Sequence, residues 1–298
     1  MWKISFFLIS IILFSLFSFT TAVADRKYPS LRDRSDPLFE QALEGALRAE
    51  FGLEFWKMVE ARKASIVVVD ITDLRQPLVA GINADEMMYA ASLPKIAILL
   101  GAFVQIENGK MMLDETTRTA LTRMIRNSSN EAATDMLQRV GIANLAEILQ
   151  SDRLRLYDPK FNGGLWVGRD YSGGPNWKRD PLHNISHGAT AMQVARFYYL
   201  LVTDRLVSAD LGKEMREMLS KPALQHKFVK GLKARPRAEI YRKSGTWQRF
   251  HADSGVIVRE KHKYIIVAMA EHSRGADELT QLIVAVDDMM ERMRPSSQ

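Results

Sequence analysis

The chain has 298 residues, a formal net charge of +6 and 47% hydrophobic residues. This is the composition of a globular protein of one large or two smaller units, and it excludes a disordered, collagen-like or low-complexity chain. The sequence contains no cysteine, which excludes disulfides, thiol nucleophiles and zinc–thiolate sites. Its 41 basic residues are interspersed with 35 acidic ones, so we expect a solvated surface and no nucleic-acid partner.

The first 24 residues have the pattern of a secretory signal peptide. Lys3 supplies a positive charge, residues 4–19 are apolar apart from serines, and Ala22-Val23-Ala24 offers small residues at the cleavage site. The apolar run is short for a membrane-spanning helix. We therefore expect cleavage before Asp25, a secreted or periplasmic protein and no stable membrane span after signal removal; an uncleaved anchor is the alternative.

The first part of the mature chain predicts a helix and a strand pair. Residues 25–35 are polar, and we expect a flexible lead-in. Asp36 followed by Pro37 is typical of a helix start. The β-branched run Ser65–Asp70 predicts a buried strand, with Pro77–Asn83 as its hairpin partner.

A long helical region follows. From Ser92 to about Leu219 the pattern is helical, interrupted by residues 157–187, which are rich in glycine and proline. So long a loop in a compact domain is usually functional. Strands are predicted again late in the chain, before an amphipathic helix at about residues 277–293; they are Glu239–Lys243, Gly255–Val258 and Tyr264–Ala270.

Strands near both ends of the chain therefore flank a helical middle. This order predicts an α/β (α+β) fold with an antiparallel sheet flanked by helices and an all-α part. We assign residues 36–91 and 220–298 to the α/β part and residues 92–219 to the helical part, together forming one catalytic domain over residues 36–298. A ligand cleft is expected at the seam between the two parts.

Three short motifs each occur once in the chain, and their order along it is informative. They are Ser92-Leu93-Pro94-Lys95, Ser128-Ser129-Asn130 and Lys243-Ser244-Gly245-Thr246. Each alone has a bland interpretation, as a helix cap, a helix-start turn or a strand end. Together, and in these contexts, they indicate a nucleophilic site.

The residue types suit acyl transfer. If Ser92 opens a helix, Lys95 shares its first turn. A serine hydroxyl needs a neighbour that takes its proton, and burial together with the helix N-terminus lowers the pKa of a lysine enough to do so. Ser128 could relay a proton to a leaving group, and Asn130 could orient the lysine or bind a substrate amide.

The third motif suits substrate binding. Lys243 adds a positive charge for a substrate carboxylate. The backbone N–H groups of Ser92 and Thr246 could together hold an oxyanion.

The motif set resembles that of the class A serine β-lactamases and the wider penicillin-recognising family. The segments at residues 86–92 and 124–133 agree with it, and the resemblance extends over about residues 38–293. It implies a five-stranded antiparallel sheet with flanking helices and an acyl-enzyme on Ser92. It also implies a monomer without cofactor or metal, acting on a β-lactam or a cell-wall peptide. The implied site residues are catalytic Ser92, Lys95 and Ser128 and substrate-binding Asn130, Lys243, Ser244, Gly245 and Thr246.

The sequence departs from the class A pattern in three ways. Ser129 stands where the family has an aspartate of chiefly structural importance, and the 36 positions from Ser92 to Ser128 are fewer than usual, which predicts a more open site. No glutamate occurs between Glu147 and Glu214, although a loop glutamate is the accepted deacylation base. Replacement bases in the loop are Asp158 and Asp170, with Asp180 a weaker one, and each is otherwise interpreted as a turn residue.

Three functions remain open on these grounds. The first is a β-lactamase-like serine hydrolase, and the second is a penicillin-binding D-alanyl peptidase that deacylates slowly. The third is a non-hydrolytic binding protein that kept the fold. A carboxylate from the long loop that reaches Ser92 would favour turnover. The loop aromatics Trp166, Tyr171 and Trp177 either line a substrate groove or attach the loop to the body.

Overall fold

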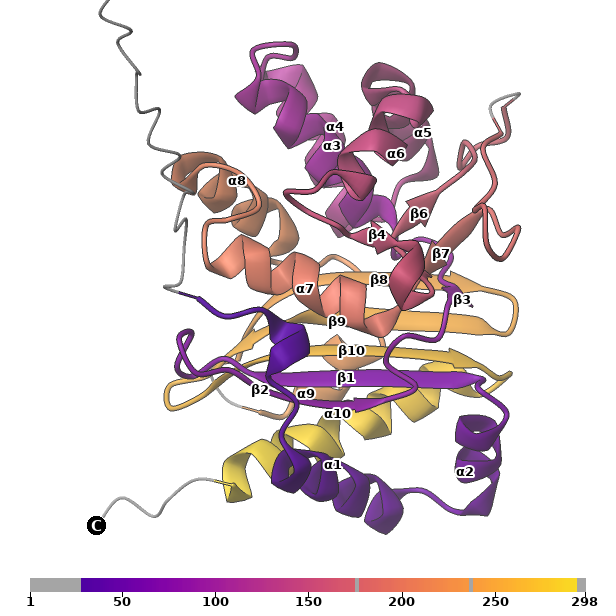
Figure 1. Cartoon of the computed structure of the whole chain (residues 1–298), viewed down its shortest axis with the longest axis vertical. Coiled ribbons are helices and arrows are strands. Elements are labelled where there is room, and N and C mark those ends of the chain that lie inside the picture. The colour runs from indigo at the N-terminus through magenta and orange to yellow at the C-terminus, as the bar shows by residue number, and fades with distance from the viewer. Residues whose placement is uncertain (1–27, 175–176, 236–237, 294–298) are drawn as a thin grey trace, which may run out of the picture.

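The computed structural model describes residues 28–174, 177–235 and 238–293, and its middle layer is a five-stranded antiparallel sheet (Figure 1). Helices α1 (Pro37–Glu50) and α10 (Gly275–Arg292) cover one face of this sheet. Helix α7 (Ala191–Val202) lies on the other face, with further helices beyond it. The predicted fold class is confirmed.

The sheet has the strand order β2-β1-β10-β9-β8. Its strands are β1 (Ala64–Asp70), β2 (Leu78–Ile82), β8 (Glu239–Trp247), β9 (Phe250–Val258) and β10 (Lys263–Glu271). In the centre Val67 of β1 lies opposite Val267 of β10. Both are fully buried, because helices cover both faces and β-branched side chains pack well on a pleated surface. The predicted strands are confirmed, and β8 and β9 run several residues beyond their predicted bounds.

The face covered by α1 and α10 also carries two short helices, α2 (Leu53–Glu60) and α9 (Phe228–Leu232). Helix α1 begins as predicted, because the Asp36 side chain accepts a 2.8 Å hydrogen bond from the Phe39 N–H and Pro37 occupies the first turn. Apolar side chains of α1 and α10 pack together with one face of the sheet; they include Phe39, Leu43, Leu47, Leu282, Ile283 and Val286.

The other side of the molecule is mostly helical. Its helices besides α7 are α3 (Lys95–Glu107), α4 (Glu115–Arg126), α5 (Asn130–Val140), α6 (Ile142–Gln150) and α8 (Ala209–Leu219). Helix α3 contacts α4, α5, α6 and α8 and is buried without a break from Lys95 to Phe103. Helix α7 packs on β1 and β10 although it falls within the residues assigned to the helical part. The division into two parts stays a prediction.

The long loop is built from very short elements. Tyr157–Asp158 (β4) pairs with Gly163–Gly164 (β5) around the 3₁₀ turn Pro159–Phe161 (η2), while Met88–Tyr89 (β3), Trp166–Val167 (β6) and His187–Ala189 (β7) form a small sheet in the order β3-β7-β6. The Ala90 N–H donates to the His187 carbonyl at 2.9 Å. The loop is therefore hydrogen-bonded to the segment that leads into Ser92.

The N-terminal segment is described only from residue 28 onward. In the described part of the lead-in Leu31–Asp33 forms a 3₁₀ turn (η1), Leu31 is buried in the core and Ser35 pairs with Val79, and the flexibility of residues 25–35 stays a prediction. The proposed signal peptide, residues 1–24, lies outside the described residues. Within residues 28–174, 177–235 and 238–293, no helix combines the length and apolarity that crossing a membrane requires.

Candidate active site

Ser92 lies on a turn between β3 and α3. Helix α3 begins at Lys95 and not at Ser92 as predicted, because the preceding residues form tighter i→i+3 hydrogen bonds. The Lys95 N–H donates to the Ser92 carbonyl at 3.3 Å, and Ala91 has a φ of 50°. Ser92 is partly exposed on this turn while Leu93 and Lys95 are buried. The turn therefore presents the serine and encloses the lysine.

Lys95 is fully buried and points to the second motif. Its Nζ donates to the Ser128 carbonyl at 2.6 Å and to Asn130 Oδ1 at 2.7 Å. Burial lowers the pKa of Lys95 to about 7, and no carboxylate of the described chain acts to raise it. Near neutral pH a large fraction of this side chain is therefore an uncharged amine, as the sequence argument predicts for a base.

The three residues of the second motif have three different environments at the start of α5. Ser128 has a φ of 59°, its carbonyl accepts from Lys95, and its Oγ accepts from Lys243 Nζ at 2.9 Å. Ser129 caps α5, with its Oγ accepting from the Ala132 N–H at 3.1 Å. Asn130 is the first helical residue. Ser129 therefore has a structural role as the cap of α5.

This capping role leads to a testable expectation. We expect Ser129→Ala to lower the free energy of unfolding by about 1 kcal/mol, because it removes the capping hydrogen bond, whereas Ser129→Asp retains a cap and changes it by only a few tenths. Urea denaturation of the two variants measures this difference. Ser208→Ala is the matched control, since Ser208 starts α8 without a side-chain capping bond in the described structure. An equal loss in Ser129→Ala and Ser208→Ala contradicts the assignment.

The third motif lies on β8 beside the Ser92 turn. Lys243 is buried, and its Nζ donates to Ser128 Oγ and, at 2.6 Å, to the Ser244 carbonyl. Burial, with the neighbouring charge of Lys95 second, holds the pKa of Lys243 well below its usual value. A Cβ at Gly245 would lie 2.1 Å from the Ala90 carbonyl and 2.9 Å from the Ser92 nitrogen. Only a glycine lets β8 pass so close to the turn that carries Ser92.

The structure therefore brings the predicted set together. Side chains of the second and third motifs are hydrogen-bonded through Ser128, the Lys95 amine joins them, and Gly245 places the exposed Thr246 next to the Ser92 backbone. Residues separated by 115 positions, Ser128 and Lys243, meet directly.

The sequence analysis missed Lys227, which precedes α9. It is 1% exposed, and its Nζ donates to the Gly245 carbonyl at 2.6 Å, Thr246 Oγ1 at 2.7 Å and the Ala252 carbonyl at 3.0 Å. Burial lowers the pKa of Lys227 to about 8. No local sequence signal marks this lysine, because its partners come from β8 and β9.

A buried ion pair stands behind the third motif and was also missed. Arg242 Nη2 lies 2.7 Å from Asp253 Oδ2, and both side chains are almost fully buried. Asp253 also accepts from the Phe228 N–H at 3.1 Å and the Ser254 N–H at 3.0 Å. The pair thus joins β8, β9 and α9 next to Lys243. Such pairs contribute little net stability, but removing one partner is strongly destabilising.

The three loop aspartates have different surroundings. Asp158 caps η2, with its Oδ1 accepting from the Lys160 N–H at 3.0 Å. Asp170 is 2% exposed. Its Oδ2 lies so close to Gly174 that a Cβ there would be only 2.0 Å away. Asp180 accepts from the Tyr157 hydroxyl and from the backbone N–H of the residue at 183. The contacts of Asp158 and Asp180 agree with the turn interpretation, whereas Asp170 is buried beside Gly174.

Of the three loop aromatics, one has the attaching role that was predicted as an alternative. Trp166 is buried in the core and its Nε1 donates to the Lys178 carbonyl at 2.7 Å, so it attaches the loop to the body. Trp177 is 46% exposed and lies between the guanidinium groups of Arg169 and Arg179. Tyr171 contacts Lys95.

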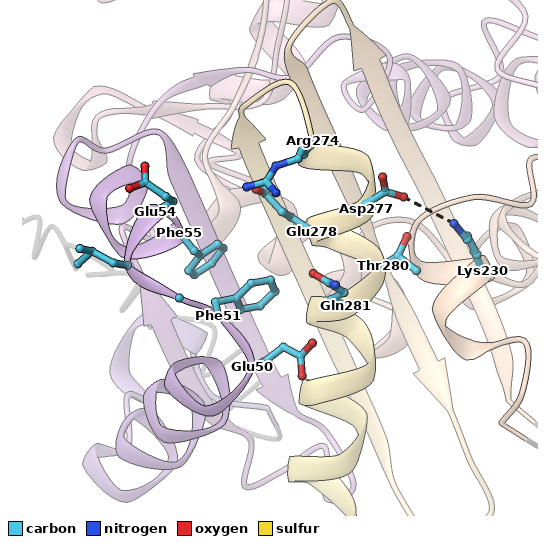
Figure 2. A pocket seen from close by; sticks show the side chains of 12 residues that line it. Glu50, Phe51, Glu54, Phe55, Lys230, Arg274, Asp277, Glu278, Thr280 and Gln281 are labelled. Carbon is cyan, nitrogen blue, oxygen red and sulfur yellow. Dashed lines mark ion pairs between the residues drawn. The ribbon is translucent and has the colours of Figure 1, made fainter.

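A separate pocket of about 710 Å³ lies on the opposite side of the sheet, between α2 and the N-terminal half of α10 (Figure 2). The stacked rings of Phe51 and Phe55 form one wall, and the Lys230–Asp277 ion pair lies across α10 from them. No residue of the three motifs lines it. This pocket is therefore distinct from the Ser92 site.

Comparisons with known proteins give a consistent picture. The family model described as "Beta-lactamase enzyme family" matches residues 54–120 and 116–289, while a comparison with curated proteins finds no match.

Among solved structures, the fold is similar to a PBP-A variant in an acyl-enzyme complex with penicillin G (16% identity, TM-score 0.67, 89% of this chain and 100% of that one). It is also similar to the β-lactamase of Sphaerobacter thermophilus DSM 20745 (15%, 0.64, 86% and 99%) and to a class A β-lactamase representative from Bacteroides cellulosilyticus DSM 14838 (15%, 0.64, 85% and 98%). The family model covers well over half of the chain, and the chain therefore belongs to the beta-lactamase enzyme family.

Proposed function

We propose that this protein is a serine hydrolase that opens β-lactam amides through an acyl-enzyme on Ser92. Ser92 Oγ bonds to the lactam carbonyl carbon and the C–N bond breaks. The Ser92 proton passes to Lys95, the leaving nitrogen takes the Ser128 proton, and Ser128 Oγ regains a proton from the protonated Lys95, so that both groups return to their starting forms. Water then releases the acyl group from Ser92 in a second step.

The observation that carries the proposal is the hydrogen bonding of Lys95. A neutral lysine amine has two N–H donors and one lone pair. The two short contacts, to the Ser128 carbonyl and Asn130 Oδ1, use both donors. The remaining lone pair is then free to take a proton from Ser92, and the pKa of about 7 keeps the amine in this form near neutrality.

The third motif supports binding of a carboxylate-bearing substrate. Thr246 Oγ1 accepts a hydrogen bond from Lys227, so its own O–H can donate to a substrate oxygen. Lys243 Nζ donates a hydrogen bond to Ser128 Oγ. A substrate carboxylate beside Lys243 would favour the charged form of this lysine. The approach of β8 to the Ser92 nitrogen supports an oxyanion site formed by the N–H groups of Ser92 and Thr246.

We further propose that the chain acts outside the cytoplasmic membrane as a monomer. The proposal of export rests on the signal-like residues 1–24. β-Lactams and cell-wall peptides, the two substrate classes considered for the site, are found in that compartment.

The test is intact-protein mass spectrometry after mixing with penicillin G. We expect a covalent adduct of one penicillin per chain in the native protein and none in Ser92→Ala. Ser220→Ala, which changes a serine at the end of α8, is the matched control and should retain the adduct. Absence of an adduct in the native protein overturns β-lactam acylation and favours a non-hydrolytic binding protein.

The lifetime of the adduct separates the two enzymatic candidates. An adduct that clears within seconds indicates a β-lactamase, whereas one that persists for hours indicates an enzyme resembling the penicillin-binding D-alanyl peptidases. One observation favours the second: the loop carboxylates of Asp158 and Asp180 accept hydrogen bonds from backbone N–H groups of the loop itself.

A further inference from the structure

Tyr171, from the long loop, lies directly against the base. Its ring centroid is 4.5 Å from Lys95 Nζ, and its hydroxyl donates to the Ala91 carbonyl at 3.2 Å. The backbone N–H of Tyr171 donates to Thr134 Oγ1 on α5 at 3.1 Å. The residue is therefore held at both ends, by the turn that carries Ser92 and by the helix that begins with Asn130.

The imidazole ring of His187, in β7, packs against the Tyr171 ring. The two ring centroids are 4.2 Å apart. His187 Nε2 lies 3.0 Å from the Arg169 carbonyl, so this nitrogen carries the proton and donates, and Nδ1 accepts from Ser186 Oγ at 3.1 Å. Burial lowers the pKa of His187 to about 4, and burial also raises that of Tyr171 well above its usual value. Both rings are uncharged at neutral pH.

The groups that face Lys95 can be named element by element. Asn130 and the Ser128 carbonyl face it from the start of α5, and Tyr171 faces it from the loop. Two basic groups lie further off, Lys243 on β8 and His187 on β7, and each is influenced by the Lys95 charge. Within the described chain, no carboxylate shifts the pKa of Lys95.

We propose that Tyr171 is a positioning residue that shields Lys95 from solvent and excludes the water that would hydrolyse an acyl group on Ser92. This inference rests on the proposed acyl-enzyme function and deepens it. Hydrolysis needs a water that bonds to the ester carbonyl carbon, passes its proton to a base and displaces Ser92 Oγ. In this site the Tyr171 ring covers Lys95 and offers no carboxylate to hold and activate such a water, so the release of the acyl group from Ser92 is slow.

The first test titrates Lys95 directly. In protein labelled with ¹³C at lysine Cε, with the Lys95 signal assigned by its loss in Lys95→Met, we expect a midpoint near 7. In Tyr171→Leu, where the ring no longer shields the amine, the midpoint should rise by about one pH unit or more. Tyr171→Phe keeps the ring and should stay within about 0.3 units. Tyr171→Met serves the same purpose if the Leu variant does not fold.

The second test measures the lifetime of the penicillin adduct by mass spectrometry. We expect it to shorten about tenfold in Tyr171→Leu, because water then reaches the ester, and to change little in Tyr171→Phe. Tyr199→Phe is the control, since Tyr199 likewise donates to a backbone carbonyl, that of Leu74, at another place in the fold. A merely structural Tyr171 would lower the melting temperature without moving the Lys95 midpoint.

The two tests fail independently. A Lys95 midpoint or an adduct lifetime that is unchanged in Tyr171→Leu overturns the inference. If the native protein forms no adduct, the proposed function falls, and the Lys95 titration still decides whether Tyr171 shields the base.

Discussion

Replacing Lys95 by methionine is expected to slow acylation of Ser92 by about 10³-fold at pH 7.5, within the range of general-base contributions. Lys95 is the residue of the first two motifs that can act as a base. The two N–H donors of its neutral amine are engaged by the Ser128 carbonyl and Asn130 Oδ1, which leaves its lone pair for the Ser92 proton. Methionine has a similar shape and no lone pair of comparable basicity. The Ser92 hydroxyl then keeps its proton and remains a poor nucleophile.

The measurement is the rate of adduct formation with penicillin G as a function of pH. In the native protein the rate should rise with pH around a midpoint near 7, because the reactive form is the neutral amine and the pKa of Lys95 is lowered to about 7. Lys221→Met is the control, since Lys221 is an exposed lysine paired with Glu217. A Lys95→Met variant that acylates at the native rate contradicts the assignment of the base.

The same lysine should make the stability of the protein depend on pH. Its pKa is about 7 in the folded chain and about 10.4 in an unfolded one. Between these values the unfolded state holds the proton and the folded state does not, so the free energy of unfolding rises with pH. The slope from this residue is about 1.4 kcal/mol per pH unit. The penalty is complete below pH 7 and absent above the unfolded pKa.

Urea denaturation at pH 7.5, 8.5 and 9.5 tests this expectation. Lys95→Met should show a slope lower than that of the native protein by about 1.4 kcal/mol per pH unit, and a higher stability at pH 7.5, because the buried amine is gone. Lys221→Met should keep the native slope. Parallel stability curves for the native protein and Lys95→Met would show that burial does not lower the pKa of this lysine. The expected result, a more stable Lys95→Met variant at pH 7.5, would mean that the protein keeps Lys95 as its base although the buried amine lowers the free energy of unfolding.

The sheet and the terminal helices were open to prediction because their signals are local. The β-branched run at β1 and the Asp36-Pro37 helix start each depend on neighbours along the chain. The start of α3 was less accessible. The i→i+3 bonds around Ser92 depend on β3, on β8 at Gly245 and on Tyr171, none of which is near in sequence.

The roles of individual residues in the long loop were even harder to predict from the sequence. The loop's length and glycine content predicted a functional role for residues 157–187, yet Asp158 and Asp180 hold turns there. The aromatic at 171, noted only as one of three loop rings, is the residue that reaches Lys95. The turn role of Asp158 could be predicted from its residue type. Whether Tyr171 or Asp170 contacts Lys95 depends on how the loop packs against α5, which no local pattern indicates.

By itself the sequence determined the fold class, the order of the three motifs and the chemistry that their residue types permit, because periodicity, turn residues and side-chain types are written along the chain. Only the tertiary structure decided the state of those groups. Burial from every direction lowers the pKa of Lys95, and Lys227 and the Arg242–Asp253 pair hold β8 beside the Ser92 turn. Solvent exclusion and contacts across 115 positions are properties of the packed chain, and no local pattern encodes them.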